Sequence, residues 1–176
     1  LTKSDPRYPR KAGDLKDAPP VLYYQGALRE IGNSVGIVGA RRCSQKMKQK
    51  CVEIAQSYIR QGIAIVSGMA KGIDAYASTV CVNEGGYTIA VLGNGLDICY
   101  PAEHQPLMNR IREQGLLISE YPPGTKPTAY RFPQRNRIIS AWSDQVIILA
   151  PGKGSGSLIT GDYARQYGRK THIIYQ

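Results

Sequence analysis

Short apolar runs recur from about residue 34 to the end of the chain, and a segment with helical spacing follows most of them. The runs are rich in Ile, Val and Leu, which is typical of strands buried on both faces of a sheet. Between them, apolar side chains such as Met47, Cys51 and Ile54 recur three or four positions apart, as on one face of a helix. The pattern predicts strands over 34–40, 63–68, 87–93, 116–121, 145–150 and 171–175, and helices over 44–60, 73–84, 102–114, 135–143 and 157–167.

This alternation of strands and helices predicts an α/β fold. Strands joined through helices run parallel, so we expect a mostly parallel, doubly wound, Rossmann-like sheet with helices on both faces. We expect residues 27–176 to form this domain. Its ligand should bind beyond the carboxyl ends of the strands, at the point where the order of the strands reverses.

The first 26 residues have a different composition, with several prolines and charges of both signs. We expect residues 1–26 to form an extended N-terminal arm that leads into the domain. Within it, the run VLYY at 21–24 predicts either a short edge strand or a packing segment.

Glycines, hydroxyl groups and basic residues follow most of the predicted strands. Glycine lets backbone N–H groups approach an anion, and a helix N-terminus adds a favourable dipole. Because these loops meet at one edge of the sheet, they predict a phosphate-binding crevice, although Ser44 and Ser157 also fit helix N-cap positions. The predicted binding residues in these loops are Gly39, Arg41, Arg42, Ser67, Gly68, Lys71, Gly72, Lys126, Lys153, Ser155 and Ser157.

The segment FPQRNR at 132–137 places an aromatic ring, two arginines and an asparagine directly before an apolar run. Arginine matches phosphate oxygens with two parallel hydrogen bonds, so Arg135 and Arg137 are predicted to bind phosphates. Phe132 fits either base stacking or core packing, and Asn136 either a helix cap or a base edge. For Arg137, an ion pair with Asp144 or Glu120 is the alternative.

Two tyrosines, Tyr100 and Tyr121, also fall near the predicted crevice. They could stack on bases, but core packing is the interpretation we favour for both.

Charge narrows the ligand class. The formal net charge of +10 favours a polyanion, chiefly nucleic acid, because binding releases counterions from the phosphate backbone. No apolar run is long enough to span a bilayer and no signal segment opens the chain, so we expect a cytoplasmic protein without a membrane partner. The four cysteines form no CxxC pair, which favours reduced thiols over a disulfide framework or a metal site.

The crevice lacks the motifs of a cofactor site. The first turn, GIVGARRCS, lacks the third glycine of GxGxxG, and GKGSGS does not match the P-loop GxxxxGK[ST]. His104 and His172 lie far apart, and no Ser/His/Asp set or metal cluster falls among the loops. We therefore expect no cofactor, no metal and no catalysis, and a site that binds.

Six motifs carry a family resemblance: VGARRCS, SGMAKGID, LGNGLDICYP, SEYPPGTKP, FPQRNRIIS and SGSLIT. In order and spacing they resemble those of DNA-processing protein A, the DprA or Smf family. The resemblance implies a domain that binds single-stranded DNA, forms a homodimer and loads the RecA recombinase in natural transformation, with single-strand-binding protein as a further partner. It matches Arg41 to the arginine of the family's G-x-R turn, and Phe132, Arg135 and Arg137 to its FPxRNR motif.

One departure from the family and two alternatives remain. Members usually have an acidic residue just before the SGSLIT turn, where this chain has Ala150. A late Gly/Ser loop is also similar to that of phosphoribohydrolases of the lysine-decarboxylase-like group, whose motif is PGGxGTxxE. Here Thr160 occupies the position of that glutamate, so the general acid/base is missing. The other alternative is a sensor of a small nucleotide in the same crevice.

Overall fold

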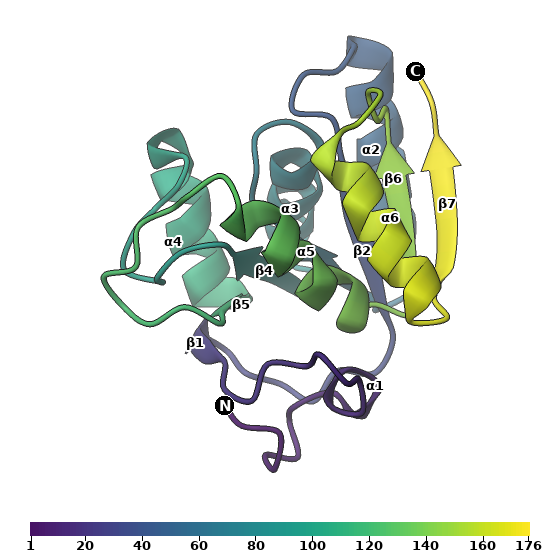
Figure 1. Cartoon of the computed structure of the whole chain (residues 1–176). Coiled ribbons are helices and arrows are strands. Elements are labelled where there is room, and N and C mark those ends of the chain that lie inside the picture. Colours follow the sequence, from purple (N-terminus) through teal and green to yellow (C-terminus); the bar gives the residue numbers. More distant parts are fainter.

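A computed structural model describes residues 1–176 and shows one sheet of seven strands in the order β1-β5-β4-β3-β2-β6-β7 (Figure 1). All neighbouring strands are parallel except β1, which pairs antiparallel with β5. The strands are β1 (Tyr23–Gly26), β2 (Ser34–Gly39), β3 (Ala64–Ser67), β4 (Thr88–Leu92), β5 (Leu116–Ser119), β6 (Gln145–Leu149) and β7 (Lys170–Ile174). The predicted mostly parallel α/β sheet is confirmed, and the run at 21–24 leads into an edge strand.

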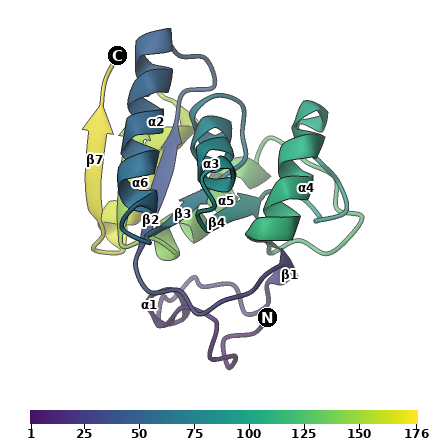
Figure 2. The ribbon, with the colours of Figure 1, turned by 180° about the vertical axis from the view of Figure 1, so that it is seen from behind.

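Helices cover both faces of the sheet (Figures 1 and 2). One face carries α2 (Gln45–Ile59), α3 (Ile73–Asn83) and α4 (Gln105–Gln114), and the short 3-10 helix η1 (Ala102–His104) precedes α4. The other face carries α5 (Arg131–Ala141) and α6 (Gly156–Gln166). The short α1 (Arg10–Gly13) belongs to the N-terminal segment. The fold is therefore doubly wound, as the alternation predicts.

The order of strands reverses at β2. From β2 the chain steps outward through β3, β4 and β5, and α5 then returns it to β6 on the opposite side of β2. The connections that leave β2 and β6 therefore diverge to opposite faces of the sheet. This divergence opens a crevice beyond the carboxyl ends of these two strands, where such folds bind ligands.

The helix of the FPQRNR segment begins earlier than predicted. It starts at Arg131 rather than Arg135, so Phe132 and Pro133 lie in its first turn. Proline is tolerated there because the first N–H groups of a helix have no partner within the helix. Asn136 consequently lies inside α5 and is not its cap. By contrast, Ser44 caps α2 as predicted, since its Oγ accepts a hydrogen bond from the Met47 N–H at 3.3 Å.

The N-terminal segment is packed against the domain, and the prediction of an extended arm is not confirmed. Tyr8 is 4% exposed, and its ring meets that of Trp142 edge-on with centroids 5.9 Å apart. Lys11 Nζ lies 2.7 Å from a carboxylate oxygen of Asp144, just before β6. Because Tyr8 and Leu22 are buried, the segment gains contacts that proline content and mixed charge do not reveal. It lies at the amino edge of the sheet, away from the crevice (Figure 1).

A buried acid and a buried arginine connect the strand ends at the opposite edge. Asp74, at the start of α3, accepts hydrogen bonds from the N–H groups of Gly39 (3.3 Å), the last residue of β2, and Gly68 (3.1 Å), directly after β3. Arg135, from α5, is 3% exposed and donates to the carbonyl oxygens of Gly68 (2.8 Å) and Val91. The two side chains thus tie three central strands to helices on both faces.

Gly68 is the residue between these two charges. A Cβ at this position would lie 2.6 Å from Arg135 Nη2 and 2.6 Å from Asp74 Oδ2, closer than any ordinary contact. Burial raises the pKa of Asp74 to about 6, against the opposing effect of Arg135 and of the backbone N–H groups. Burial likewise lowers the pKa of Arg135 to about 10, against the opposing effect of Asp74.

The Asp74 carboxyl should make stability fall as pH rises from about 4 to 6. Its pKa is higher in the folded than in the unfolded chain, so the folded state holds more protons in this window. The free energy of unfolding should therefore decrease by about 2–3 kcal/mol relative to Asp74→Asn, measured by urea unfolding at several pH values. Other carboxyls act equally in both proteins, so unfolding free energies that run parallel with pH would contradict this prediction.

Candidate functional site

A crevice of about 590 Å³ lies beyond the carboxyl ends of β2 and β6. Three segments form it: the turn after β2, the first turns of α5, and the loop between β6 and α6. The predicted site residues that line it are Gly39, Arg41, Arg42, Phe132, Arg135, Asn136, Ser155 and Ser157. The structure thus brings together side chains that are more than 100 positions apart in the sequence.

Arg41 and Arg42 are the free cations of this crevice. Both side chains are exposed, and neither takes part in an ion pair. Their turn packs tightly on Gly72, which has φ +80° and whose Cβ, if present, would lie 2.2 Å from the Ala40 carbonyl oxygen. The Ile73 N–H also donates to that carbonyl at 3.1 Å. The turn is therefore held in place while its two arginines face solvent.

The N-terminus of α6 forms the opposite wall. Ser155 is at the N-cap position, but its hydroxyl lies 2.8 Å from the Ser157 hydroxyl and does not cap a backbone N–H. Ser157 is inside the helix, so its predicted N-cap role is wrong. Thr160 also lines the crevice, and its buried Oγ1 has no hydrogen-bond partner. The positive end of the helix dipole and the hydroxyl groups of Ser155 and Ser157 make this wall suitable for an anion.

A smaller cavity of about 80 Å³ adjoins the crevice. Arg41, Phe132 and Arg135 line both, so the two hollows lie side by side. Here the rings of Tyr100 and Phe132 are stacked, with centroids 5.4 Å apart and planes at 25°. Tyr100 is 48% exposed, so the core packing that we favoured for it is wrong.

Lys71 lies on the rim of this smaller cavity. Its Nζ is 2.8 Å from a carboxylate oxygen of Glu103, and both side chains are exposed. The hydrogen bond from Lys71 lowers the pKa of Glu103. Nearby, His104 Nδ1 lies 3.0 Å from the Met69 carbonyl oxygen, so η1 is joined to the loop after β3 by two contacts. Lys71 is thus positioned for an anion but already paired.

Several predicted site residues are buried and have structural partners. Arg135 forms the floor of the crevice, where its hydrogen bonds to two backbone carbonyls leave it unsuited to a mobile phosphate. Asn136 donates to the Gly156 carbonyl oxygen at 2.9 Å and so ties α5 to the start of α6. Ser67 is fully buried and donates to the Ile37 carbonyl oxygen at 2.6 Å. Gly68 and Gly72 have no side chain, so only their backbone atoms could contact a ligand.

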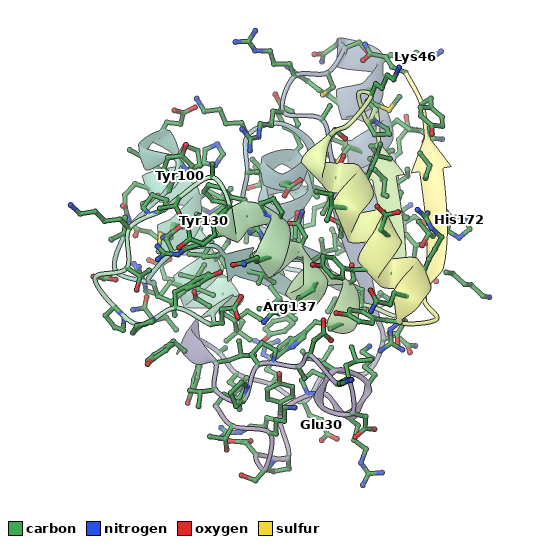
Figure 3. The ribbon with its side chains drawn as sticks, in the orientation of Figure 1. Glu30, Lys46, Tyr100, Tyr130, Arg137 and His172 are labelled. Atoms are coloured by element: carbon green, nitrogen blue, oxygen red, sulfur yellow. The ribbon has the colours of Figure 1, made fainter.

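Arg137 lies outside the crevice, contrary to its predicted grouping with Arg41. Its guanidinium donates to both carboxylate oxygens of Glu120, each at 2.7 Å, which is one of the ion pairs weighed as an alternative. This bond raises the pKa of Arg137. The side chain borders a separate depression with Asp17 and Tyr163, toward the N-terminal segment (Figure 3). Residues two positions apart on a helix are separated by about 200° around its axis, so Arg137 projects from a different side of α5 than Arg135.

Two predicted lysines are exposed but do not line either hollow. Lys126 lies in the loop between β5 and α5, and Lys153 lies in the loop before α6. Residues that the sequence did not single out include Gln176, which lines the crevice from beyond β7, and Tyr130, which is exposed before α5. No local pattern marks Gln176, because only the sheet order brings the last strand beside β6.

The chain holds neither a metal-binding cluster nor a membrane-spanning helix. No group of three or more His, Cys, Asp or Glu side chains could hold an ion. None of its helices combines the length and apolar character needed to cross a bilayer.

Solved structures with the same fold give a direct comparison. DNA processing protein A from Streptococcus pneumoniae superposes with a TM-score of 0.94 at 38% identity, covering 100% of this chain and 62% of that one. A structure that concerns the single-stranded DNA binding mode of DNA processing protein A from Helicobacter pylori gives 0.89 at 32% identity, covering 96% and 78%. A molybdenum cofactor binding protein from Rippkaea orientalis, at 16% identity and a TM-score of 0.60, shares the fold alone.

Sequence comparison points to the same family. Protein Smf of Synechocystis is 44% identical over 174 residues, which is 96% of this chain and 44% of that protein. The chain spans about half the length of the curated relatives that it matches. The family model for DNA recombination-mediator protein A matches residues 1–175. The chain therefore belongs to the DNA recombination-mediator protein A family, known as DprA or Smf.

Proposed function

We propose that this chain binds single-stranded DNA in the crevice between β2 and β6, as part of a recombination mediator. The observation that carries the proposal is the convergence of two unpaired arginines, a helix N-terminus and a stacked aromatic pair at one edge of the sheet. The structure of the Helicobacter pylori relative supports it, because that structure concerns a single-stranded DNA binding mode. The net charge of +10 favours the same ligand class.

Phosphates of the strand would bind to the cationic side of the crevice. Arg41 and Arg42 offer guanidinium groups that match phosphate oxygens bidentately. On the facing wall, Ser155 and Ser157 offer hydroxyl groups at the positive end of α6. The backbone at Gly39, Gly68 and Gly72 permits close approach, and the outlying cations that could follow the strand further are Lys71, Lys126 and Lys153.

The aromatic pair would favour an unpaired strand. A base stacks on an aromatic face only when it is not already stacked inside a duplex, and such stacking contributes about 1–3 kcal/mol per base. Phosphate contacts alone would bind single and double strands alike. The stacked rings of Tyr100 and Phe132 therefore account for the strand preference in this proposal.

The hydrolase alternative is not favoured. Its chemistry requires a glutamate where this chain has Thr160, and a threonine hydroxyl does not serve as a general acid/base near neutral pH. In the structure Thr160 is fully buried within α6. A protein that only binds its ligand does not need an acidic residue at the position of Thr160.

The family supports a more specific role. We propose that the bound strand is handed to RecA in the cytoplasm, with single-strand-binding protein displaced, and that a homodimer performs this step. These partners are implied by membership in the recombination-mediator family. In this proposal the crevice binds the strand, and surfaces outside the crevice bind RecA.

Replacing Arg41 or Arg42 by Ala should weaken binding of fluorescein-labelled oligothymidine by about 3- to 10-fold near 0.1 M salt. Each variant should also reduce the slope of log K against log salt by about 0.7, because one phosphate contact is lost. Anisotropy titrations at several salt concentrations measure both quantities, with a duplex of equal length as the comparison ligand.

Two further variants serve as controls for this prediction. Arg60→Ala removes an exposed arginine at the C-terminus of α2, away from the crevice, and should leave the slope unchanged. Arg137→Ala should lower stability through loss of the Glu120 pair, again without a change in slope. A slope reduced equally in all the variants, or in none, would argue against the proposed site.

Replacing Glu103 by Gln should strengthen binding at low salt by about 2- to 5-fold. The substitution frees Lys71 to meet phosphate and removes a negative charge beside the strand. The gain should disappear at high salt, where the pair is screened. Glu113→Gln removes a charge from an exposed residue near the end of α4 and is the matched control. Equal gains in both variants would mean that net charge, and not Lys71, is responsible.

RecA loading can be tested separately from strand binding. On DNA covered by single-strand-binding protein, the chain should shorten the lag of the RecA ATPase, and Arg41→Ala should lose this effect. An unchanged lag with intact binding of single-stranded DNA would reject the RecA step and leave the binding proposal standing.

A further inference from the structure

Phe132 already has neighbours on its ring. Tyr100 is stacked on it at 5.4 Å, and the guanidinium carbon of Arg135 lies 6.0 Å from the centre of the same ring. Gly93 also closes on it, since a Cβ there would be 3.0 Å from Phe132 Cδ1. Phe132 is half-buried as a result. Its ring supports the aromatic pair, and little of its surface remains free for a base.

Tyr100 presents the exposed ring of the pair. It is 48% exposed and lies beyond the beginning of α5, on the same side as Tyr130 (Figure 3). Other tyrosines, such as Tyr24 and Tyr175, are also exposed, but Tyr100 borders the smaller cavity beside the crevice and is stacked on a second ring. Because Phe132 supports it from beneath, Tyr100 can offer a ring to a second flat group without first losing an intramolecular contact.

The loop that carries Tyr100 is held firmly. The buried Asn94 donates from Nδ2 to the carbonyl oxygens of Gly95 (2.9 Å) and Ile98 (2.7 Å). Asp97 accepts from the Gly124 N–H at 2.8 Å, which joins this loop to the one before α5. A ring held in a fixed position loses little conformational entropy when a base stacks on it.

Cations line the cavity that this ring borders. Tyr100 borders the smaller cavity together with Arg41 and Lys71, and that cavity adjoins the main crevice, with Arg41 in the lining of both. A strand whose phosphates meet Arg41 would therefore bring the adjoining base toward Tyr100. Because Arg41 lines both hollows and carries this charge, the occupant that fits beside Tyr100 is an unpaired base of the same strand.

We propose that Tyr100 is a base-stacking residue that sets the preference of this site for unpaired DNA, with Phe132 as the ring that supports it. The inference rests on the proposed function, since it places one base of the strand bound in the crevice. It assigns to Tyr100 the role that the sequence pattern assigned to Phe132.

The test compares Tyr100→Ala and Tyr100→Phe with the unaltered chain on two ligands of equal length and charge. One is oligothymidine and the other is an abasic strand with the same phosphates but no bases. On oligothymidine, Tyr100→Ala should weaken binding by about 5- to 100-fold, whereas Tyr100→Phe should retain binding within about 2-fold. On the abasic strand, all three proteins should bind alike, because only phosphates remain.

Tyr24→Ala is the matched control, since it removes another exposed tyrosine from β1, at the far edge of the sheet. It should bind both ligands as the unaltered chain does. If Tyr100→Ala lost affinity equally on both ligands, the ring would act through loop structure and the inference would be wrong. The inference would also be wrong if Tyr100→Ala bound oligothymidine normally while Arg41→Ala did not, and the proposed function would then survive. If the unaltered chain bound no single-stranded DNA, both would fail.

Discussion

The contact between Asp74, Gly68 and Arg135 is the constraint on which the rest of the site depends. Two opposite charges are buried there, and a charge removed from water is costly unless other groups satisfy it. Backbone N–H groups at the ends of β2 and β3 donate hydrogen bonds to Asp74, and carbonyl groups at the ends of β3 and β4 accept hydrogen bonds from Arg135. The strand ends, α3 and α5 are thereby held in one arrangement, and glycine is the only residue that fits between them.

The crevice results from this arrangement. Because Arg135 anchors the start of α5, Phe132 one turn earlier is directed over the ends of the central strands, where Tyr100 stacks on it. Because Asp74 anchors the start of α3, the loop with Gly72 supports the turn that carries Arg41. Buried charges thus help to position the exposed ones.

Two of the four arginines predicted to bind DNA have partners within the chain, and two have none. Arg135 and Arg137 have their hydrogen bonds satisfied within the chain, whereas Arg41 and Arg42 form no ion pair. A paired guanidinium gains little from a phosphate, because the new contact replaces an existing one. An unpaired one gives up only water. In the proposed function this difference makes the turn after β2 the main anchor for a polyanion, although the FPQRNR segment looks richer in charge.

The sequence alone determined the order of strands and helices, the parallel sheet and the edge at which the crevice lies. These follow from local periodicity and from the short list of ways in which strands and helices connect. The prediction failed where the local pattern was ambiguous. At the start of α5, Pro133 can either precede a helix or lie in its first turn. In the N-terminal segment, the buried Tyr8 belongs to no periodic pattern of apolar residues. The tertiary structure decided which charges and rings are free. Arg137 pairs with Glu120, Arg135 donates to Gly68 and Val91, and Tyr100 stacks on Phe132. Each of these partners comes from another part of the chain, so the local sequence does not predict it.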